Sequence, residues 1–386
     1  DEVLDADGLL ALPGFVDLHT HLREPGREDA ETVATGTLAA ARGGFTAVTT
    51  MANLNPVTDT ANAVRNLRAI AAADASAEVV VVGAITRGLA GAELSDLAAM
   101  ASEGVTIFSD DGRCVMDARL MREAMDLIRA SGGVLAQHCQ DHNLAGPSAC
   151  CHECAISDEL GLPGWPSVAE SSIIARDVEL AAYTGCRYHA CHVSTAESVE
   201  VIRWAKRRGL PVTAEVMPHH LLLETALLRT GDTVYKVNPP LRTAEHVEAV
   251  RAALADGTID MVGTDHAPHA AKDKTKPFPE ASPGMLGLEQ ALGVVLATMI
   301  EPGRLAWSDV PRILSAAPAA LVGLREQGRP LAVGEPANLV LVDPEARAEV
   351  DREATASKSR NNPYAGLVLP DPIVATFWRG VPTYRR

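Results

Sequence analysis

A short segment near the start of the chain decides the fold: Gly14-Phe15-Val16-Asp17-Leu18-His19-Thr20-His21. It opens as an apolar run and ends in two histidines that are separated by one residue. In an extended strand the side chains alternate between two faces, so both imidazoles lie on the same face. Two neutral imidazoles aimed at one point can bind zinc or a similar ion. The segment therefore predicts a buried strand with candidate metal ligands at its carboxyl end.

Seven further apolar runs follow this segment, and amphipathic stretches separate them. Several runs are short and β-branched, and most follow a Gly or a Pro, which favours strands over helices. Eight strand–helix alternations predict an α/β fold, which is either a (β/α)₈ barrel or a doubly wound sheet. The eight predicted strands are Gly14–His19, Phe45–Met51, Glu78–Ile85, Val105–Ser109, Val134–His138, Arg187–Val193, Pro211–Val216 and Ile259–Thr264. Helices are predicted at Glu28–Arg42, Thr58–Ala73, Asp117–Ala130 and Thr195–Arg208.

Polar residues lie at the carboxyl end of six of the predicted strands. Barrel enzymes build their sites at this edge, so the placement favours a barrel over a doubly wound sheet. Four His and two Asp exceed what one open catalytic zinc needs, which predicts two metal ions bridged by one carboxylate. In chain order the polar residues are His19, His21, Asn53, the pair Asp110-Asp111, His138, His192 and Asp265.

The end of the chain has a different character. From about Gly334 it contains short alternating runs, such as Ala337–Val342 and Ile373–Trp378, with Pro and Gly between them. The first residues have a similar character, so we expect the two ends to pair. The predicted division is a remnant of a small β-domain at 1–11, a barrel at 12–326 and the rest of the small β-domain at 327–386. We expect that the first strands of this domain precede the given sequence.

The composition limits the classes of partner. The formal net charge of −16 argues against nucleic acid or an anionic membrane as the main partner, although it allows a small anionic substrate. No apolar run reaches the roughly 18–20 residues that a membrane span needs. The seven cysteines are an odd number without disulfide-scaffold spacing, which predicts reduced thiols and a cytoplasmic protein. Cys151 and Cys154 form a CxxC, but no second pair exists to complete a structural zinc site.

Several longer motifs make the chain resemble the amidohydrolase superfamily and, within it, the bacterial class I dihydroorotases. The resemblance runs along nearly the whole chain, and the HxHxR and TDHAPH segments together are highly specific. The motifs are Pro13–Gly26, Phe108–Gly112, Cys191–Thr195, Lys236–Arg242, Gly263–His269 and Ala356–Arg360 with Asn362-Pro363-Tyr364.

The resemblance implies a role for each candidate residue. His19, His21 and Asp265 would hold one Zn²⁺, and His138 with His192 a second, with Asp111 between them. The neighbouring Asp110 stays open as an alternative to Asp111. Asp265 would also carry the catalytic proton. The residues implied in substrate binding are Arg23, Asn53 and His269 for a ring carboxylate, and Asn238 with backbone groups of Pro283 and Gly284 for an amide edge.

The activity implied by the resemblance is the reversible, metal-dependent cyclisation of N-carbamoyl-L-aspartate to L-dihydroorotate. One alternative is a hydantoinase, dihydropyrimidinase or allantoinase, in which a carboxylated lysine takes the bridging place. The strand Thr106-Ile107-Phe108-Ser109 contains no lysine, which speaks against these enzymes. The other alternative is a catalytically silent homologue that scaffolds aspartate carbamoyltransferase. The expected partners are the small-molecule substrate, a second copy in a homodimer, and aspartate carbamoyltransferase in a complex.

Overall fold

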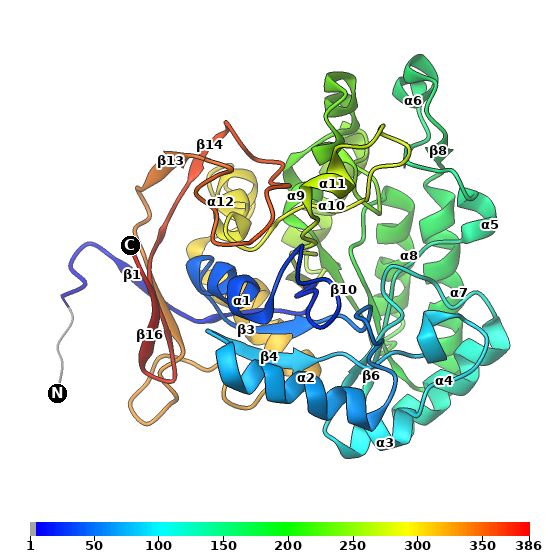
Figure 1. Ribbon diagram of the computed structural model, residues 1–386, viewed down its shortest axis with the longest axis horizontal. Helices are drawn as coiled ribbons and strands as arrows, with labels where there is room; N and C mark the ends of the chain where they lie inside the picture. The colour runs from blue at the N-terminus through cyan, green and yellow to red at the C-terminus, as the bar shows by residue number, and fades with distance from the viewer. Residues whose placement is uncertain (1–4) are drawn as a thin grey trace.

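The computed structural model describes residues 5–386 and shows an α/β fold with parallel sheets (Figure 1). One parallel sheet has the order β2-β3-β4 and another the order β11-β10-β9-β6-β5. Two isolated parallel bridges, Gly83 to Phe108 and Thr20 to His266, link the edges of these sheets. The parallel strands are β2 Phe15–Asp17, β3 Phe45–Thr50, β4 Glu78–Val81, β5 Ile107–Phe108, β6 Val134–Gln137, β9 Arg187–Ala190, β10 Val212–Val216 and β11 Met261–Val262.

Each predicted strand contains one of these observed strands, and each observed strand is shorter than predicted. The predicted helices are observed as α1 Val33–Arg42, α2 Ala61–Asp74, α4 Ala118–Ala130 and α8 Ala196–Arg207. Helix α1 starts later than predicted because Thr32 caps it, accepting a hydrogen bond from the Thr35 backbone N–H. The other α-helices are α3 Leu97–Ser102, α5 His142–Ala145, α6 Ala155–Leu160, α7 Val168–Thr184, α9 Pro218–Leu222, α10 Ala244–Ala255, α11 Ala271–Lys274, α12 Ala291–Val295 and α13 Ala317–Val322.

The core has two main parts. The larger part fills the space between the strands and the surrounding helices. A second, inner cluster contains buried residues from most parallel strands, such as Val16, Ala47, Ile107 and Met261. Ala319, Leu321 and Val322 of α13 belong to this inner cluster. Because the inner cluster is apolar, the polar ends of the strands are left as the place where a site can form.

A four-stranded antiparallel sheet joins the two ends of the chain, on the left of Figure 1. Its order is β1-β12-β15-β16, so the predicted pairing of the chain ends is confirmed for Leu10–Pro13 with Leu339–Val342. Residues 1–4 of the predicted domain remnant lie outside the described residues. The antiparallel and short strands are β1 Leu10–Pro13, β7 Cys151–His152, β8 Gly164–Trp165, β12 Leu339–Val342, β13 Arg347–Glu349, β14 Val368–Pro370, β15 Ile373–Trp378 and β16 Val381–Arg385.

The carboxylate of Asp17 ties the first parallel strand to the segment after β11. One oxygen accepts the backbone N–H of His19 at 2.9 Å and of Thr264 at 3.1 Å, and the other accepts the Thr264 hydroxyl at 2.5 Å. Asp17 is fully buried, and burial raises its pKa to about 7 against the effect of these hydrogen bonds. This contact holds the residues that follow the two strands, His19 and Asp265, next to each other.

Candidate functional site

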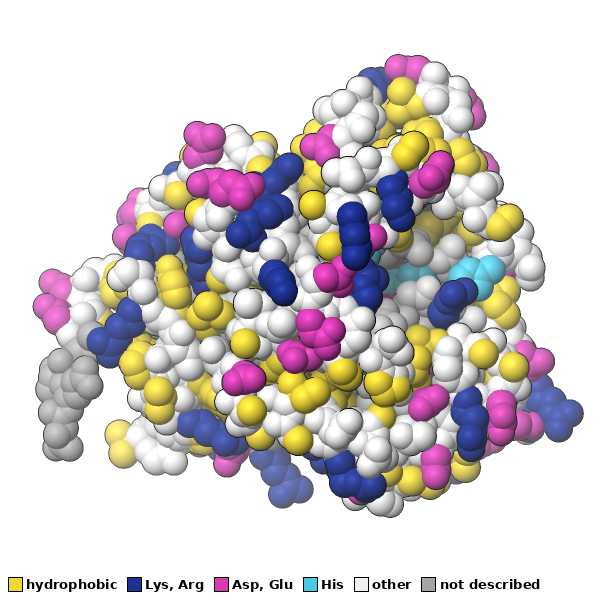
Figure 2. Space-filling view, viewed as in Figure 1, with side chains coloured by type: hydrophobic (Ala, Val, Ile, Leu, Met, Phe, Trp, Pro, Cys, Tyr) yellow, Lys and Arg dark blue, Asp and Glu magenta, His cyan; other side chains and the backbone are white. Residues whose placement is uncertain are grey.

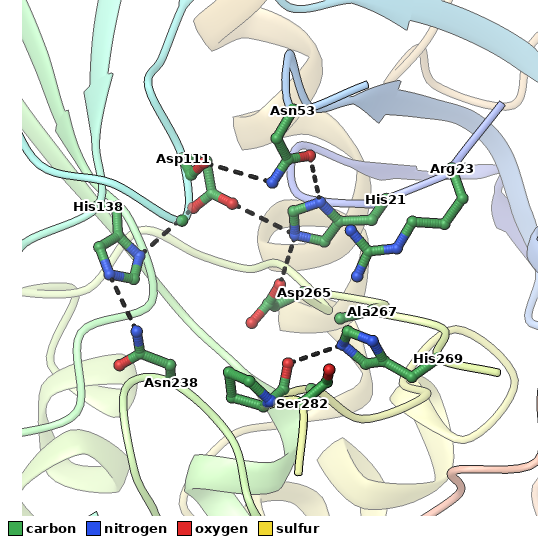
Figure 3. Close-up of a pocket in the computed structure, with 13 residues that line it drawn as sticks. His21, Arg23, Asn53, Asp111, His138, Asn238, Asp265, Ala267, His269 and Ser282 are labelled. Carbon is green, nitrogen blue, oxygen red and sulfur yellow. Dashed lines mark hydrogen bonds and ion pairs between the residues drawn. The ribbon is translucent and has the colours of Figure 1, made fainter. Parts of the chain in front are cut away.

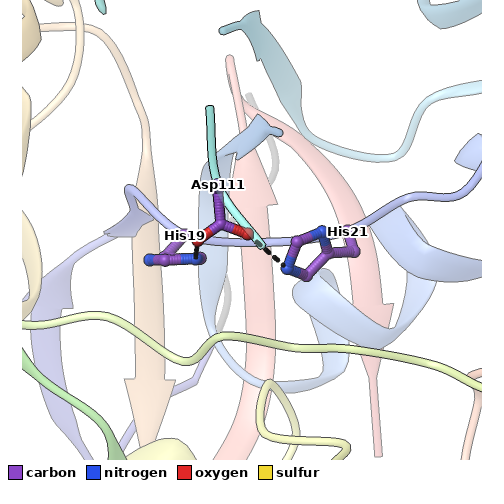
Figure 4. Close-up of side chains that lie close together, drawn as sticks. All are labelled: His19, His21 and Asp111. Carbon is purple, nitrogen blue, oxygen red and sulfur yellow. Dashed lines mark ion pairs between the residues drawn. The ribbon is translucent and has the colours of Figure 1, made fainter. Parts of the chain in front are cut away.

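Asp111 lies at the centre of the histidine cluster. Its Oδ1 is 3.1 Å from Nε2 of His19, and its Oδ2 is 3.3 Å from Nε2 of His21 (Figure 4). The same Oδ1 is 3.5 Å from Nε2 of His192 and 3.6 Å from Nδ1 of His138. The structure therefore brings all four histidines around one carboxylate, three of them near Oδ1 and His21 near Oδ2.

Asp265 completes the cluster on the side of the first two histidines. Its Oδ1 is 3.0 Å from Nε2 of His21 and 3.6 Å from Nε2 of His19. Asp110, the alternative to Asp111, faces away: its carboxylate accepts the backbone N–H groups of Ile85 and Thr86 at 2.7 and 3.0 Å. All six predicted ligands therefore lie together, and Asp111 rather than Asp110 is among them.

The cluster has the properties of a metal site. Two groups, His19 with His21 and Asp111, and Asp111 with His138 and His192, have their ligand atoms within 4.8 Å of one another. Nε2 of His19 and Oδ1 of Asp111 are buried and form no hydrogen bond. Buried polar atoms normally have a partner, and a cation would supply one here. The nitrogen and oxygen donors fit zinc and similar divalent ions.

The electrostatics of the cluster also favour a cation. Burial acts against a charge on His19, yet the carboxylates of Asp111 and Glu215 outweigh it and raise the pKa of His19 well above its usual value. Burial would raise the pKa of Asp111, but the charge of His19 and the close contacts with His138 and His192 hold it well below its usual range. A negative environment that favours a proton on His19 favours a metal ion for the same reason.

Two side chains that sequence reasoning missed orient the histidines: Glu215, which is buried, and Gln140, which is partly buried. Oε1 of Glu215 lies 2.6 Å from Nδ1 of His19, which leaves Nε2 to face Asp111. The other Glu215 oxygen lies 3.4 Å from Nε2 of His189. Oε1 of Gln140 lies 3.0 Å from Nε2 of His138 and leaves its Nδ1 for the cluster. The sequence did hold a signal for Glu215, because a charged residue inside the apolar run Pro211–Val216 indicates a buried glutamate with a specific partner.

Three of the site residues have left-handed backbone conformations: Arg23, His192 and Asp265 have φ values of 62°, 36° and 45°. Non-glycine residues seldom adopt this region, and such residues concentrate at functional sites. Within the described chain, Leu89 and Arg379 are the other non-glycine residues with positive φ. The backbone therefore turns sharply at the strand ends and aims these side chains inward.

A cavity of about 190 Å³ opens beside the cluster. It is smaller than the roughly 300–1,000 Å³ pockets of drug-sized ligands, so it suits a compact molecule. Figure 2 shows a hollow on this face, with histidine inside it and Lys and Arg side chains around it. The lining includes, from the predicted site, His21, Arg23, Asn53, Asp111, His138, Asn238, Asp265, His269, Pro283 and Gly284 (Figure 3).

Arg23 brings a cation into this cavity. Its Nε donates to the Pro268 carbonyl at 3.1 Å, and it forms no ion pair with any carboxylate of residues 5–386. Burial lowers its pKa to about 10, against the effect of Asp265, so it stays charged at neutral pH. A guanidinium with free donors in a small cavity can bind a carboxylate with paired hydrogen bonds.

Two predicted substrate ligands have different surroundings. Oδ1 of Asn53 lies 3.0 Å from Nδ1 of His21, and its amide nitrogen donates to the Asp111 carbonyl at 3.3 Å. Asn53 therefore contacts the ligand cluster itself. Asn238 donates to Oε1 of Gln140 at 3.0 Å, while its own Oδ1 is buried without a partner. That free oxygen can accept a hydrogen bond from a substrate N–H.

The predicted backbone contacts of Pro283 and Gly284 are engaged within the protein. The Gly284 N–H donates to the Lys236 carbonyl at 2.9 Å, and Nε2 of His269 lies 2.8 Å from the Pro283 carbonyl oxygen. The Gly284 carbonyl oxygen lies 3.1 Å from the amide nitrogen of Asn361. Both residues line the cavity, but the Gly284 N–H already has an acceptor within the protein, so it is not free for a substrate.

The Cys150–Cys154 segment takes no part in this cluster. In the described part of the chain, every group that could hold an ion includes His19 or Asp111, and none includes a cysteine of this segment. Cys191 lies near His19, but burial raises its thiol pKa to about 12, so it remains protonated. All seven cysteines are free thiols. No helix among residues 5–386 is long and apolar enough to cross a membrane.

Solved structures with the same fold define the class of protein. The chain is similar to L-hydantoinase (dihydropyrimidinase) from Arthrobacter aurescens, with a TM-score of 0.88 and 25% sequence identity, covering 99% of this chain and 87% of that one. It is also similar to dihydropyrimidinase from Brevibacillus agri NCHU1002, with a TM-score of 0.87 and 23% identity, covering 100% and 87%. The fold is that of the hydantoinases and dihydropyrimidinases.

Curated relatives narrow this class to one family. A family model described as dihydro-orotase-like matches residues 8–198. The chain is 54% identical over 384 residues to dihydroorotase from Streptomyces coelicolor, covering 99% of this chain and 90% of that protein. It is 50% identical over 386 residues to dihydroorotase from Mycobacterium tuberculosis, covering 100% and 90%. The chain belongs to the dihydroorotase family.

Proposed function

We propose that this chain catalyses the reversible cyclisation of N-carbamoyl-L-aspartate to L-dihydroorotate in pyrimidine biosynthesis. The observation that supports it most directly is the joint placement of Arg23 and the His–Asp cluster in one small cavity. Dihydroorotate carries both features that this cavity can recognise: a ring carboxylate for Arg23 and a cyclic amide for the cluster. Hydantoin and dihydrouracil lack the carboxylate, so they leave the Arg23 guanidinium without an anionic partner.

We infer that the metal is zinc, with one or two ions per chain. His19, His21 and Asp265 would hold one ion, His138 and His192 a second, and Asp111 would bridge them. When bound, these ions would lower the pKa of water and polarise the carbonyl group that reacts. Two groups of potential ligands that share Asp111 support this arrangement.

The chain's own residues would bind the substrate and move the proton. Arg23 would hold the carboxylate that the ring retains, and the free Oδ1 of Asn238 would accept an N–H of the ureido group. Asp265 borders the cavity, and hydrogen bonding with His21 and the charge of His19 outweigh burial and lower its pKa to about 2. As a carboxylate it can accept the ureido proton during ring closure and return it to the ring nitrogen during hydrolysis.

The stoichiometry sets the direction of the pH dependence. Ring closure forms a C–N bond and releases one carboxylate oxygen as water, with one proton from nitrogen and one from solution. The product has one carboxylate where the substrate has two, so closure consumes a proton. Lower pH therefore favours dihydroorotate, by about tenfold in the equilibrium ratio for each pH unit.

The test measures zinc content per chain and turnover of carbamoyl-aspartate, dihydroorotate, dihydrouracil and hydantoin. We expect turnover of the first two, a clear preference for dihydroorotate among the cyclic substrates, and the pH-dependent equilibrium. Equal or faster hydrolysis of hydantoin or dihydrouracil would instead assign another cyclic amidohydrolase. Metal-loaded protein without turnover of any substrate would favour the scaffolding alternative.

We also infer that the parallel strands form one closed (β/α)₈ barrel at 12–326, with a small β-domain at 1–11 and 327–386. The two isolated bridges between the sheet edges and the inner apolar cluster support closure. The antiparallel sheet that joins Leu10–Pro13 to the C-terminal strands supports the second domain. A homodimer and a complex with aspartate carbamoyltransferase stay predictions, which sedimentation of the chain alone and with that enzyme would test.

A further inference from the structure

Lys274, the last residue of α11, lies behind the cavity wall formed by Ser282, Pro283 and Gly284. Its side chain is partly buried and points into the loop rather than into solvent. Nζ donates to the Ser282 carbonyl at 2.9 Å, the Gly284 carbonyl at 3.2 Å and the Lys236 carbonyl at 3.3 Å. An ammonium group has three N–H donors, and here each of them has a backbone acceptor.

No carboxylate neutralises this ammonium group. Among the described residues Lys274 forms no ion pair, in contrast to its neighbour Lys272, whose Nζ lies 2.7 Å from Asp29. Burial, together with the charge of Lys236, lowers the pKa of Lys274 to about 7, and Asp232 acts in the opposite direction. Burying this amine costs solvation free energy, and its hydrogen-bond acceptors are three backbone carbonyl groups of the loop, which indicates that Lys274 serves to hold those groups.

The wall that Lys274 holds is fitted closely to the cavity. A Cβ atom on Gly284 would lie 2.7 Å from Nε2 of His269 and 2.9 Å from Cβ of Ala267. The Gly284 backbone has a φ of 147°, which a side chain would also strain. Nε2 of His269 in turn lies 2.8 Å from the Pro283 carbonyl. A shift of this wall therefore moves His269 and changes the width of the cavity next to Arg23.

We propose that Lys274 is a positioning residue for substrate binding: it ties the Ser282–Gly284 wall to the Lys236 backbone and so sets the cavity at its Arg23–His269 end. The inference rests on the proposed function, because its readout uses the two proposed substrates. Lys274 lines the far side of the wall and is absent from the residues that surround the cavity. It thus acts on the substrate through Gly284 and His269, without touching the ligand cluster.

The experiment compares Lys274→Met with the matched control Lys272→Met in the metal-loaded full chain. Lys272 lies on the same short helix, but its side chain is 71% exposed. We expect Lys274→Met to raise KM for both carbamoyl-aspartate and dihydroorotate about tenfold, because the Ser282 carbonyl loses its donor and the Gly284 and Lys236 carbonyls each lose one of two donors. We expect kcat and metal content to stay near wild-type values, and Lys272→Met to leave all three quantities unchanged.

Hydrogen exchange provides a second readout, with faster exchange expected at the Gly284 amide in Lys274→Met only. If that variant does not fold, Lys274→Arg replaces it. Arginine keeps a cation but cannot direct three donors from one nitrogen, so KM should still rise. An unchanged KM in a folded variant would overturn the inference, as would a loss of kcat and metal with KM intact. Inactive wild-type protein would overturn the proposed function instead.

Discussion

The ligand cluster and the Ser282–Gly284 wall border the same cavity but are built in different ways. The cluster residues follow the ends of parallel strands, and two of the histidines are oriented by the side chains of Glu215 and Gln140. The wall lies in a loop and is held through its backbone by Lys274 and Asn361. We infer that the strand ends determine the chemistry, whereas the loops determine which molecule reaches it. Substitutions in the two regions should therefore change different kinetic constants.

The largest effect is expected for Asp265, which belongs to the cluster and borders the cavity. Asp265→Ala removes both a candidate metal ligand and the candidate proton carrier. We expect kcat for dihydroorotate hydrolysis to fall by about 10³-fold or more. The exposed Asp126→Ala on α4 is the matched control and should have wild-type kcat. A variant that keeps substantial kcat would show that the cluster does not set the chemistry.

The next effect should appear in KM, at the other end of the cavity. Arg23→Met removes the guanidinium that lies there without a carboxylate partner. We expect KM for dihydroorotate to rise about 10²-fold, since paired charge-assisted hydrogen bonds are lost. Steady-state kinetics on both substrates measure this, with the exposed Arg119→Met as control. If kcat falls and KM does not change, Arg23 acts in the chemical step rather than in substrate binding.

A smaller effect is expected for Glu215, which touches no substrate. Glu215→Gln weakens the hydrogen bond that orients His19, and we expect metal affinity to fall about 10–100-fold. Competition with a chelator measures this affinity. Excess zinc should restore most of the lost activity, because the ligands themselves remain. Unchanged affinity would mean that His19 is held by other contacts.

The smallest effect is expected away from both regions. The double variant Cys151→Ala and Cys154→Ala removes the CxxC pair, which lies outside the candidate ion groups. We expect kcat, KM and zinc content to change by less than about twofold. Elemental analysis and kinetics check this together. A loss of one zinc per chain would reveal a second metal site in that segment.

The cluster was accessible from the sequence because its residues obey a simple geometric rule. Histidines and aspartates that follow successive parallel strands converge at one edge, so His19, Asp111 and Asp265 could be expected to meet. The sequence could not show which of Asp110 and Asp111 faces the histidines, because adjacent residues after a strand point in opposite directions and the register was not known. Asp110 bonds to the backbone of Ile85 and Thr86, which no local pattern foretells.

The wall could not be predicted in the same way. Pro283 and Gly284 were expected to offer backbone groups to a substrate, whereas the Gly284 N–H bonds to Lys236. These contacts join segments far apart in the chain, and loop sequences carry no periodicity that would indicate them. Lys274 is a lysine in a charged stretch, Lys272-Asp273-Lys274, and composition alone would place all three side chains in solvent. The predicted strands were all found, whereas helix α1 starts five residues later than predicted because its start is set by the local cap at Thr32.

The left-handed backbone at Arg23, His192 and Asp265 has a consequence for engineering. Each such residue costs about 1–3 kcal/mol of folding free energy, and glycine would relieve that cost. A search for heat-resistant variants would thus rank glycine highly at these positions, where it removes an imidazole, a carboxylate or a guanidinium. At these three positions a substitution that raises thermal stability would lower turnover, so stabilising substitutions should be sought elsewhere.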